Sequence, residues 1–286
     1  MSFNDSLFLA CQRLAPHHLI SRLAGSLADS RAPWLKNVLI GRFARRYGVA
    51  MQEARVEDPL AYESFNAFFT RALKPGARPL DATPGAVLCP ADGSVSQAGR
   101  IVDGRIFQAK GHDFGLAALL GGDAARAAPF EGGSFATIYL SPRDYHRVHM
   151  PLPGTLREMI YVPGKLYSVN PLTARNVPEL FARNERVACI FDTPGHGPMA
   201  LVLVGAMIVA SVETVWAGRI APHRSGVVAT RYEGGQAARL AQGAEMGRFL
   251  LGSTVVALFG PGRVDWAELA APGNAVRMGQ RLGHAL

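Results

Sequence analysis

The first quarter of the chain places apolar residues at the spacing of amphipathic helices. Between Ser6 and about Leu27 they recur near the helical repeat, at Leu7, Leu14, Ile20, Leu23 and Leu27. This periodicity predicts helix. Pro16 lies inside the run and lacks the amide N–H that a helix interior requires, so we expect a break or kink there and a pair of helices.

A second helical stretch, 34–47, mixes basic and apolar residues. Its basic side chains are Lys36, Arg42, Arg45 and Arg46, set among leucine, isoleucine, valine and phenylalanine. Such a mixture is typical of a helix that lies on a membrane surface. It also fits an ordinary helix whose apolar side covers the core and whose arginines are solvated, and the sequence leaves both interpretations open.

Beyond Pro90 the pattern changes to short segments rich in β-branched and aromatic residues, separated by glycine and proline. Segments of this length and composition predict β-strands. The clearest of them span 134–140, 156–162 and 187–191. The longest apolar run, 199–212, is interrupted by Gly205 and indicates one or two buried strands. We therefore predict an α+β protein, with a helical region over 1–75 and a mainly antiparallel, β-rich catalytic domain over 76–286.

Length and composition indicate a globular protein with one substantial core. The chain has 286 residues, of which 49% are hydrophobic. The 199–212 run is shorter than the roughly 20 residues that a spanning helix needs, so we expect no membrane-spanning segment. The N-terminus lacks the basic, apolar and small-residue pattern of a secretory signal, and we expect it to be retained.

The net charge limits the kinds of partner that the protein can attract, and the cysteine content indicates the redox state of its compartment. A formal net charge of +8 attracts acidic surfaces, either nucleic acid or anionic lipid. The sequence shows neither basic runs interleaved with aromatics nor a nucleic-acid fold signature, so we expect no nucleic-acid partner. The cysteines Cys11, Cys89 and Cys189 are odd in number and widely spaced. They fit a reducing compartment and predict neither disulfides nor a cysteine zinc site.

A Gly-Ser-Thr triplet near the C-terminus, beginning at Gly252, offers an unusual nucleophile. Taken alone it is a common turn sequence. Glycine has no Cβ, however, so the backbone at Gly252 can bend until the hydroxyl of Ser253 approaches the preceding carbonyl carbon. Attack on its own peptide bond would need a base for the proton and donors for the oxyanion.

Two polar segments upstream supply candidates for these roles. His146 and His149 stand in LSPRDYHRVHMPLPG, and Asp92 stands in CPADGSVSQAG. A histidine suits general-base work near neutral pH, and a carboxylate can fix its tautomer. The aspartate could instead be ordinary turn chemistry, and the histidine pair half of a metal site. Residues three apart on a regular strand face opposite sides, so a shared site requires the strand to bulge or end between them.

Four segments together resemble the prokaryotic-type phosphatidylserine decarboxylases, in the same order and over nearly the whole chain. They are SFNAFFTRALKPGARP, CPADG, LSPRDYHRVHMPLPGTLREMIYVPGKLYSVNP and EMGRFLLGSTVV. The resemblance implies a proenzyme that cleaves itself between Gly252 and Ser253, giving a β chain of 1–252 and an α chain of 253–286. Ser253 would become a pyruvoyl group that forms a Schiff base with phosphatidylserine, releasing carbon dioxide and giving phosphatidylethanolamine.

The family pattern also implies a role for each residue. Asp92, His149 and Ser253 resemble the charge-relay set for self-cleavage, and His146 resembles the histidine of the decarboxylation step. No metal and no pyridoxal phosphate are expected.

The same resemblance implies the protein's partners and its location. The substrate would lie in an anionic membrane, with the protein bound peripherally to the cytoplasmic face through its N-terminal helices. The β and α chains would stay paired, and whether the chain also forms a homo-oligomer is left open.

Three other functions compete with this interpretation. A pyruvoyl decarboxylase of a soluble amino acid would share the self-cleavage but need no membrane. A non-catalytic module that binds anionic lipid would remain a single intact chain. A conventional serine hydrolase is disfavoured, because Leu251 and Val255 occupy the glycine positions of a GxSxG elbow around Ser253.

Overall fold

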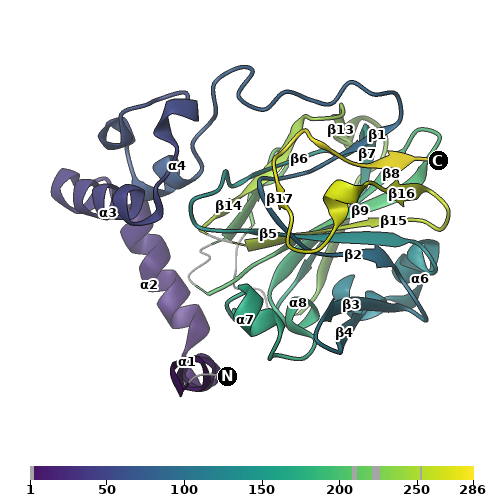
Figure 1. Cartoon of the computed structure of the whole chain (residues 1–286), viewed down its shortest axis with the longest axis horizontal. Coiled ribbons are helices and arrows are strands. Elements are labelled where there is room, and N and C mark those ends of the chain that lie inside the picture. The colour runs from purple at the N-terminus through teal and green to yellow at the C-terminus, as the bar shows by residue number, and fades with distance from the viewer. Residues whose placement is uncertain (1–2, 208–210, 221–225, 252) are drawn as a thin grey trace.

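The helices gather at the N-terminal end of the chain, as the periodicity predicts. The computed structural model describes residues 3–207, 211–220, 226–251 and 253–286. Its four N-terminal helices are α1 (Phe3–Leu14), α2 (His17–Asp29), α3 (Pro33–Tyr47) and α4 (Phe65–Phe69). They lie along one side of a β-rich body (Figure 1). Pro16 stands between α1 and α2, so the expected break is confirmed.

The body is built on a nine-stranded antiparallel sheet. Eight strands follow the order β12-β7-β8-β9-β15-β5-β2-β17, and β13 pairs with β7 off this path. Their bounds are β2 (Gly93–Arg100), β5 (Ser134–Leu140), β7 (Gly154–Val162), β8 (Arg186–Thr193), β9 (Gly197–Val204), β12 (Val228–Arg231), β13 (Arg239–Leu240), β15 (Ser253–Phe259) and β17 (Ala275–Val276). The three clearest strand predictions are therefore confirmed, and so is the α+β class.

Three smaller antiparallel sheets surround the large one. The four-stranded sheet has the order β11-β10-β14-β6, with β6 (Arg147–His149), β10 (Ser211–Thr214), β11 (Gly218–Arg219) and β14 (Glu245–Leu250). The others are β1-β18-β16, with β1 (Ala86–Leu88), β16 (Val264–Trp266) and β18 (Arg281–Ala285), and the hairpin β3 (Arg105–Ala109) with β4 (His112–Gly115). The 199–212 run thus supplies β9 and the start of β10, although 208–210 lie outside the described residues.

Short helices complete the chain between and beside the strands. The α-helical turns are α5 (Leu116–Leu119), α6 (Ala124–Ala127), α7 (Pro171–Ala174) and α8 (Leu180–Arg183). The 3-10 turns are η1 (Met51–Glu53), η2 (Pro59–Ala61), η3 (Ala128–Phe130), η4 (Gly234–Gln236) and η5 (Glu268–Ala270).

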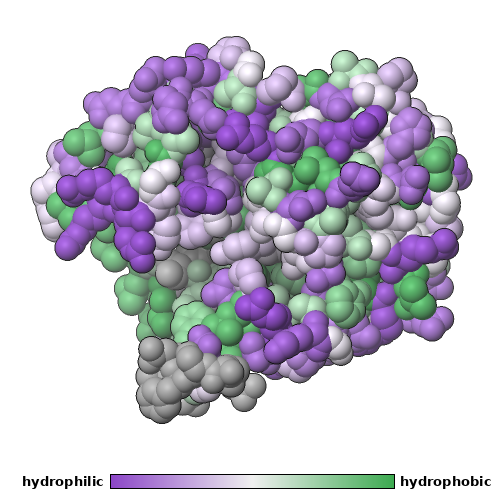
Figure 2. Space-filling view, in the orientation of Figure 1, coloured by the Kyte–Doolittle hydropathy of each residue, from purple (hydrophilic) through white to green (hydrophobic). Residues whose placement is uncertain are grey.

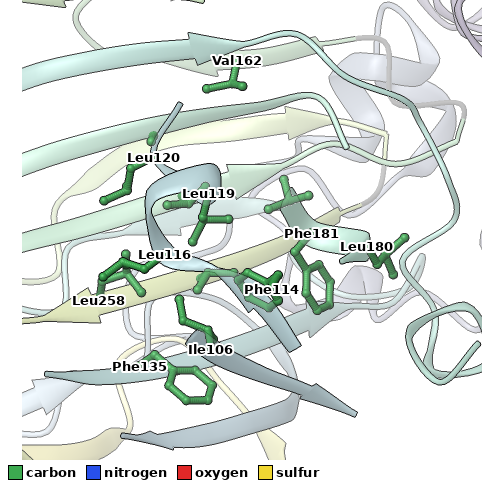
Figure 3. Packing of buried hydrophobic residues seen from close by; sticks show 14 of the residues in the cluster. Ile106, Phe114, Leu116, Leu119, Leu120, Phe135, Val162, Leu180, Phe181 and Leu258 are labelled. Carbon is green, nitrogen blue, oxygen red and sulfur yellow. The ribbon is translucent and has the colours of Figure 1, made fainter. Parts of the chain in front are cut away.

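Both faces of the large sheet are buried at its central strands, which explains why β5, β8, β9 and β15 are nearly continuous apolar runs. Along β15, Val256 and Leu258 belong to one core cluster, while Val255 and Ala257 belong to another. The first cluster is closed by α5 and α8, whose leucines and phenylalanines pack against the sheet (Figure 3). The second is closed by residues of β6, β10 and β14. Alternate residues of β15 therefore point into different cores, and neither face is left to solvent.

A small aromatic cluster joins the N-terminal helices to one another. Phe65, Phe68 and Phe69 of α4 are buried against Ile40 of α3 and Ala28 of α2. Within the described part of the chain, no helix is both long and apolar enough to cross a bilayer.

Candidate functional site

Segments far apart in the sequence meet around His146 and His149. β6 pairs with β14 in the four-stranded sheet. The amide of His149 donates to the carbonyl of Pro90 at 2.8 Å, which brings the turn containing Asp92 beside β6. The amide of Phe249, near the end of β14, donates to the carbonyl of His146 at 3.1 Å. The fold therefore brings the two predicted histidines and the predicted aspartate into one region.

A strand boundary lies between the two histidines, which is one of the conditions under which they can share a site. β6 begins at Arg147, so His149 lies on the strand and His146 lies in the preceding turn. No group of three or more potential metal ligands occurs among the described residues, and the metal-site alternative gains no support from them.

His149 is held as a neutral base. Its Nδ1 lies 2.8 Å from the carbonyl oxygen of Gly243, which can only accept, so Nδ1 carries the hydrogen. Its Nε2 therefore accepts, and the hydroxyl of Tyr145 donates to it at 3.1 Å. Burial lowers the pKa of His149 below its ordinary value, so the imidazole is uncharged at neutral pH.

Asp92 is buried and anchored by an arginine. The Nε of Arg78 donates to both carboxylate oxygens at 2.9 and 3.0 Å, and the amide of Met278 donates at 2.9 Å. Arg78 also pairs with Glu53 at 2.8 Å. Burial opposes the charge on Arg78, but bonds to the two carboxylates raise its pKa. Within the described residues Asp92 makes no hydrogen bond to His149, and its negative charge acts on that imidazole through space.

His146 is fully buried and has one unused nitrogen. Its Nδ1 donates to the carbonyl of Asp144 at 2.8 Å, while its Nε2 is buried and has no hydrogen-bond partner in the part of the chain that the structure describes. The ring of Phe69 lies 4.0 Å from it, centroid to centroid. Burial lowers the pKa of His146 to about 3, so it too is neutral. An unpaired buried acceptor is costly, which marks this nitrogen as a functional candidate.

The predicted cleavage position lies where β15 begins. In the backbone pairing, Ser253 faces Leu140 of β5. Gly252 and the side chain of Ser253 lie outside the described residues. Leu251 has φ of 81°, a left-handed conformation that a leucine rarely adopts, and its side chain packs against the aromatic cluster of α4. Backbone strain is therefore stored two residues before the predicted nucleophile.

A cavity of about 500 Å³ opens beside these groups. Its lining includes Asp92, Arg78, Tyr145 and Arg71. Ser141, which follows the residue paired with Ser253, also lines it. The cavity thus reaches the end of β5, the strand that pairs with β15.

Comparison with known proteins decides the family. A family model described as phosphatidylserine decarboxylase matches residues 65–284, and a second, described as PSD, matches residues 7–48. The phosphatidylserine decarboxylase proenzyme of Bordetella pertussis is 71% identical over 284 residues, covering 99% of this chain and 95% of that protein. The proenzyme of Bordetella avium is 68% identical over 282 residues, covering 99% of this chain and 96% of that protein. That of Pseudomonas putida is 67% identical over 278 residues, covering 96% of each.

The chain belongs to the phosphatidylserine decarboxylase family.

Several groups around this decarboxylase-family site were not predicted from the sequence, namely Arg71, Arg78, Tyr145 and Gly243. Arg71 and Arg78 stand in the SFNAFFTRALKPGARP segment that carries the family resemblance, so that segment held a signal for them. Gly243 acts through its backbone carbonyl. A backbone carbonyl has no residue-type signature, and only the fold could reveal that role.

We expect Arg78→Gln to destabilise the protein by about 3–5 kcal/mol, because it leaves Asp92 buried without its cation. The measurement is the free energy of unfolding in urea. Arg105→Gln is the matched control: Arg105 pairs with Asp113 at the surface, and its loss should cost under about 1 kcal/mol. Adding Asp92→Asn to Arg78→Gln should restore part of the stability. Equal effects of the two single substitutions would contradict a buried, coupled pair.

Proposed function

We propose that this chain is a self-cleaving proenzyme that matures into a phosphatidylserine decarboxylase. Its Ser253 becomes a pyruvoyl group, and the product of the reaction is phosphatidylethanolamine. The observation that carries the proposal is a pair of buried, neutral imidazoles with acceptor nitrogens, at His146 and His149, beside β14, the strand that precedes Ser253 in the chain. One imidazole suits the cleavage and the other suits proton transfer during decarboxylation.

In the proposed self-cleavage, His149 acts as general base toward Ser253. Because Nδ1–H of His149 is committed to Gly243, its Nε2 lone pair takes the hydroxyl proton. Burial raises the pKa of Tyr145 to about 12, so its hydroxyl stays protonated. This hydroxyl either relays the proton from Ser253 to Nε2 of His149 or moves aside so that the Ser253 hydroxyl bonds to Nε2 directly. Asp92 stabilises the imidazolium through space.

The covalent steps balance without an oxidant or reductant. The Oγ of Ser253 bonds to the carbonyl carbon of Gly252 as the peptide C–N bond breaks and the nitrogen gains a proton. Elimination then removes the Cα proton of residue 253, breaks its Cβ–O bond and frees Gly252 as a carboxylate. The dehydroalanine left behind rearranges to an imine, and water replaces ammonia to give the ketone. The products are a β chain of 1–252 and an α chain of 253–286.

The finished pyruvoyl group would take the substrate amine as a Schiff base and hold the electron pair that carbon dioxide leaves behind. His146 fits beside such a group, since its Nε2 is buried, neutral and unpaired. It can take the proton that the substrate ammonium gives up and later return it to the substrate carbon. The ring of Phe69 and complete burial keep water from this nitrogen.

A substrate that stays in the bilayer requires docking at the membrane surface, and we assign this to α2 and α3. Leu19, Leu23 and Leu27 form an exposed stripe along α2, and Trp34 of α3 is 72% exposed. Hydrophobic residues gather along the course of α2 in Figure 2. This apolar surface, with three exposed arginines on α3, suits an anionic lipid surface. The free thiol of exposed Cys11 suits the cytoplasmic face.

We expect replacement of Arg42, Arg45 and Arg46 by glutamine to weaken binding to anionic vesicles by roughly 100-fold at low salt, at about 1 kcal/mol per charge. Self-cleavage should be unchanged, because these three arginines are exposed on the surface of α3. Vesicle sedimentation measures the binding. The control is a triple substitution of exposed arginines on the β body, Arg100, Arg231 and Arg239. Equal losses in the two triple variants would show that net charge, without a docking surface, attracts the protein to vesicles.

The experiment that tests the proposed function is intact mass under denaturing conditions, followed by an assay of released carbon dioxide. We expect two fragments divided after residue 252, the smaller with an N-terminal pyruvoyl, and turnover of phosphatidylserine in vesicles. Preference for free serine would identify a decarboxylase of a soluble amino acid. A single folded, uncut chain that binds vesicles would identify a lipid-binding module.

A further inference from the structure

Arg71 is a buried cation whose hydrogen-bonding capacity is largely unused. Arg71 stands two residues after the end of α4 and is 3% exposed. Nη2 donates to the carbonyl of Arg143 at 3.1 Å, but Nε and Nη1 are shielded from solvent and have no hydrogen-bond partner among the described residues. Burial lowers the pKa of Arg71 from its ordinary value. Leaving a buried guanidinium with unpaired N–H groups costs stability, so an arginine kept there points to a ligand.

Arg186, another buried arginine, shows what a structural role looks like. Arg186 is also 3% exposed, but Nε, Nη1 and Nη2 all donate to backbone carbonyls. Those carbonyls belong to Leu119, Ala182, Asn184 and Ala118. Arg186 therefore joins neighbouring segments of the fold, whereas Arg71 has donors to spare.

The cavity that Arg71 lines has one positive charge in excess. Its lining residues include four arginines and three carboxylates: Arg71, Arg78, Arg143 and Arg277, with Glu53, Asp92 and Asp144. Arg78 bonds to both Asp92 and Glu53, and Arg277 lies 3.2 Å from Glu53. Arg71 makes no ion pair within the described residues. A singly charged anion would balance this cavity.

We propose that Arg71 binds the phosphodiester of the phospholipid head group, an assignment that rests on the proposed function. After a rotation of the Arg71 side chain, Nε–H and Nη1–H would form a two-pronged donor for two phosphate oxygens in the cavity. Ser141 of the cavity wall adjoins Leu140, the backbone partner of Ser253. The phosphate of phosphatidylserine is separated from its amine-bearing carbon by only an oxygen and a methylene group, so a phosphate bound at Arg71 would keep the amine close to this cavity wall.

The phosphate suits Arg71 better than the head-group carboxylate does. The carboxylate loses its charge as carbon dioxide departs, so a cation bound to it would stabilise the substrate more than the transition state. The phosphate keeps its charge throughout. Its binding energy is therefore available to place the reacting carbon.

The test measures binding of glycerophosphoethanolamine, which has the phosphodiester and amine but no carboxylate, by titration calorimetry. We expect wild type to bind glycerophosphoethanolamine and Arg71→Gln to bind it roughly 10- to 100-fold more weakly. The affinity of Arg71→Lys should lie between those of wild type and Arg71→Gln. The KM for a short-chain, soluble phosphatidylserine should rise in parallel. Arg231→Gln, an exposed substitution on β12, should match wild type. Both Arg71 variants should still self-cleave, which reports a correctly folded chain.

The outcomes separate this proposal from the decarboxylase function. Unchanged glycerophosphoethanolamine affinity in Arg71→Gln, with turnover intact, overturns the role of Arg71 alone. If glycerophosphoethanolamine binding depends on Arg71 but phosphatidylserine is not turned over, the anion site is supported and the decarboxylase function is contradicted. A carboxylate probe without phosphate, O-methylserine, should bind equally to wild type and Arg71→Gln. If instead only its affinity falls in Arg71→Gln, the arginine binds the carboxylate and the proposal fails.

Discussion

Ser253→Ala leaves a single full-length chain without decarboxylase activity. Alanine has no hydroxyl to attack the carbonyl of Gly252, so the peptide stays whole and no ketone forms at position 253. Removal of a nucleophilic serine from a hydrolase costs roughly 10⁶-fold in rate, and here the electrophile is lost as well. The measurement is intact mass under denaturing conditions beside an assay of released carbon dioxide.

Two further serine variants make this result specific. Ser253→Cys retains a nucleophile and should cleave at least in part, because a thiol can attack the same carbonyl. Ser134→Ala changes a serine of neighbouring β5 that bonds to the carbonyl of Val264, and it should cleave as wild type does. Fragments from Ser253→Ala divided after residue 252 would require another nucleophile, and the mechanism would have to be abandoned.

His149→Gln should slow self-cleavage by roughly 10³-fold or more, because the hydroxyl of Ser253 loses its base. The rate is followed on freshly translated precursor by the appearance of the two fragments. Burial lowers the pKa of His149, so the base is unprotonated at neutral pH. The wild-type rate should therefore be flat above pH 7 and fall on acidification only as pH passes through this lowered value, below 6.5. His149→Gln should lose that acid limb.

His146→Gln separates the two histidines. We expect it to cleave at a near wild-type rate and yet decarboxylate poorly, because the unpaired Nε2 of His146 serves the later step. His112→Gln, on β4 of the small hairpin, should leave both steps intact. Blocked cleavage in His146→Gln, with normal cleavage in His149→Gln, would exchange the two assignments.

The class of fold and the candidate chemistry could be inferred from the sequence because they depend on local order. Helical spacing with Pro16 predicted α1 and α2, and short apolar segments predicted β5, β7 and β8. Asp92, His146 and His149 are residue types able to transfer protons, and they stand in polar, turn-bounded segments. Their contacts could not be predicted in this way. The expected aspartate partner of His149 is such a case, since the described hydrogen bond goes to Gly243 and the charge-relay role of Asp92 stays a prediction.

By itself, then, the sequence determined the α+β class, the helical first quarter, the family resemblance and the residues able to perform the chemistry. The tertiary structure decided which of their atoms are paired. Pairing of β6 with β14 brings His149 to a carbonyl 94 residues away, and packing of α4 buries Arg71 with two unused donors. The physical reason is that burial and hydrogen bonding depend on neighbours distant in the sequence. Those neighbours determine the protonation state of each group and which of its donors and acceptors remain unpaired. The contacts with them form only once the sheets have formed.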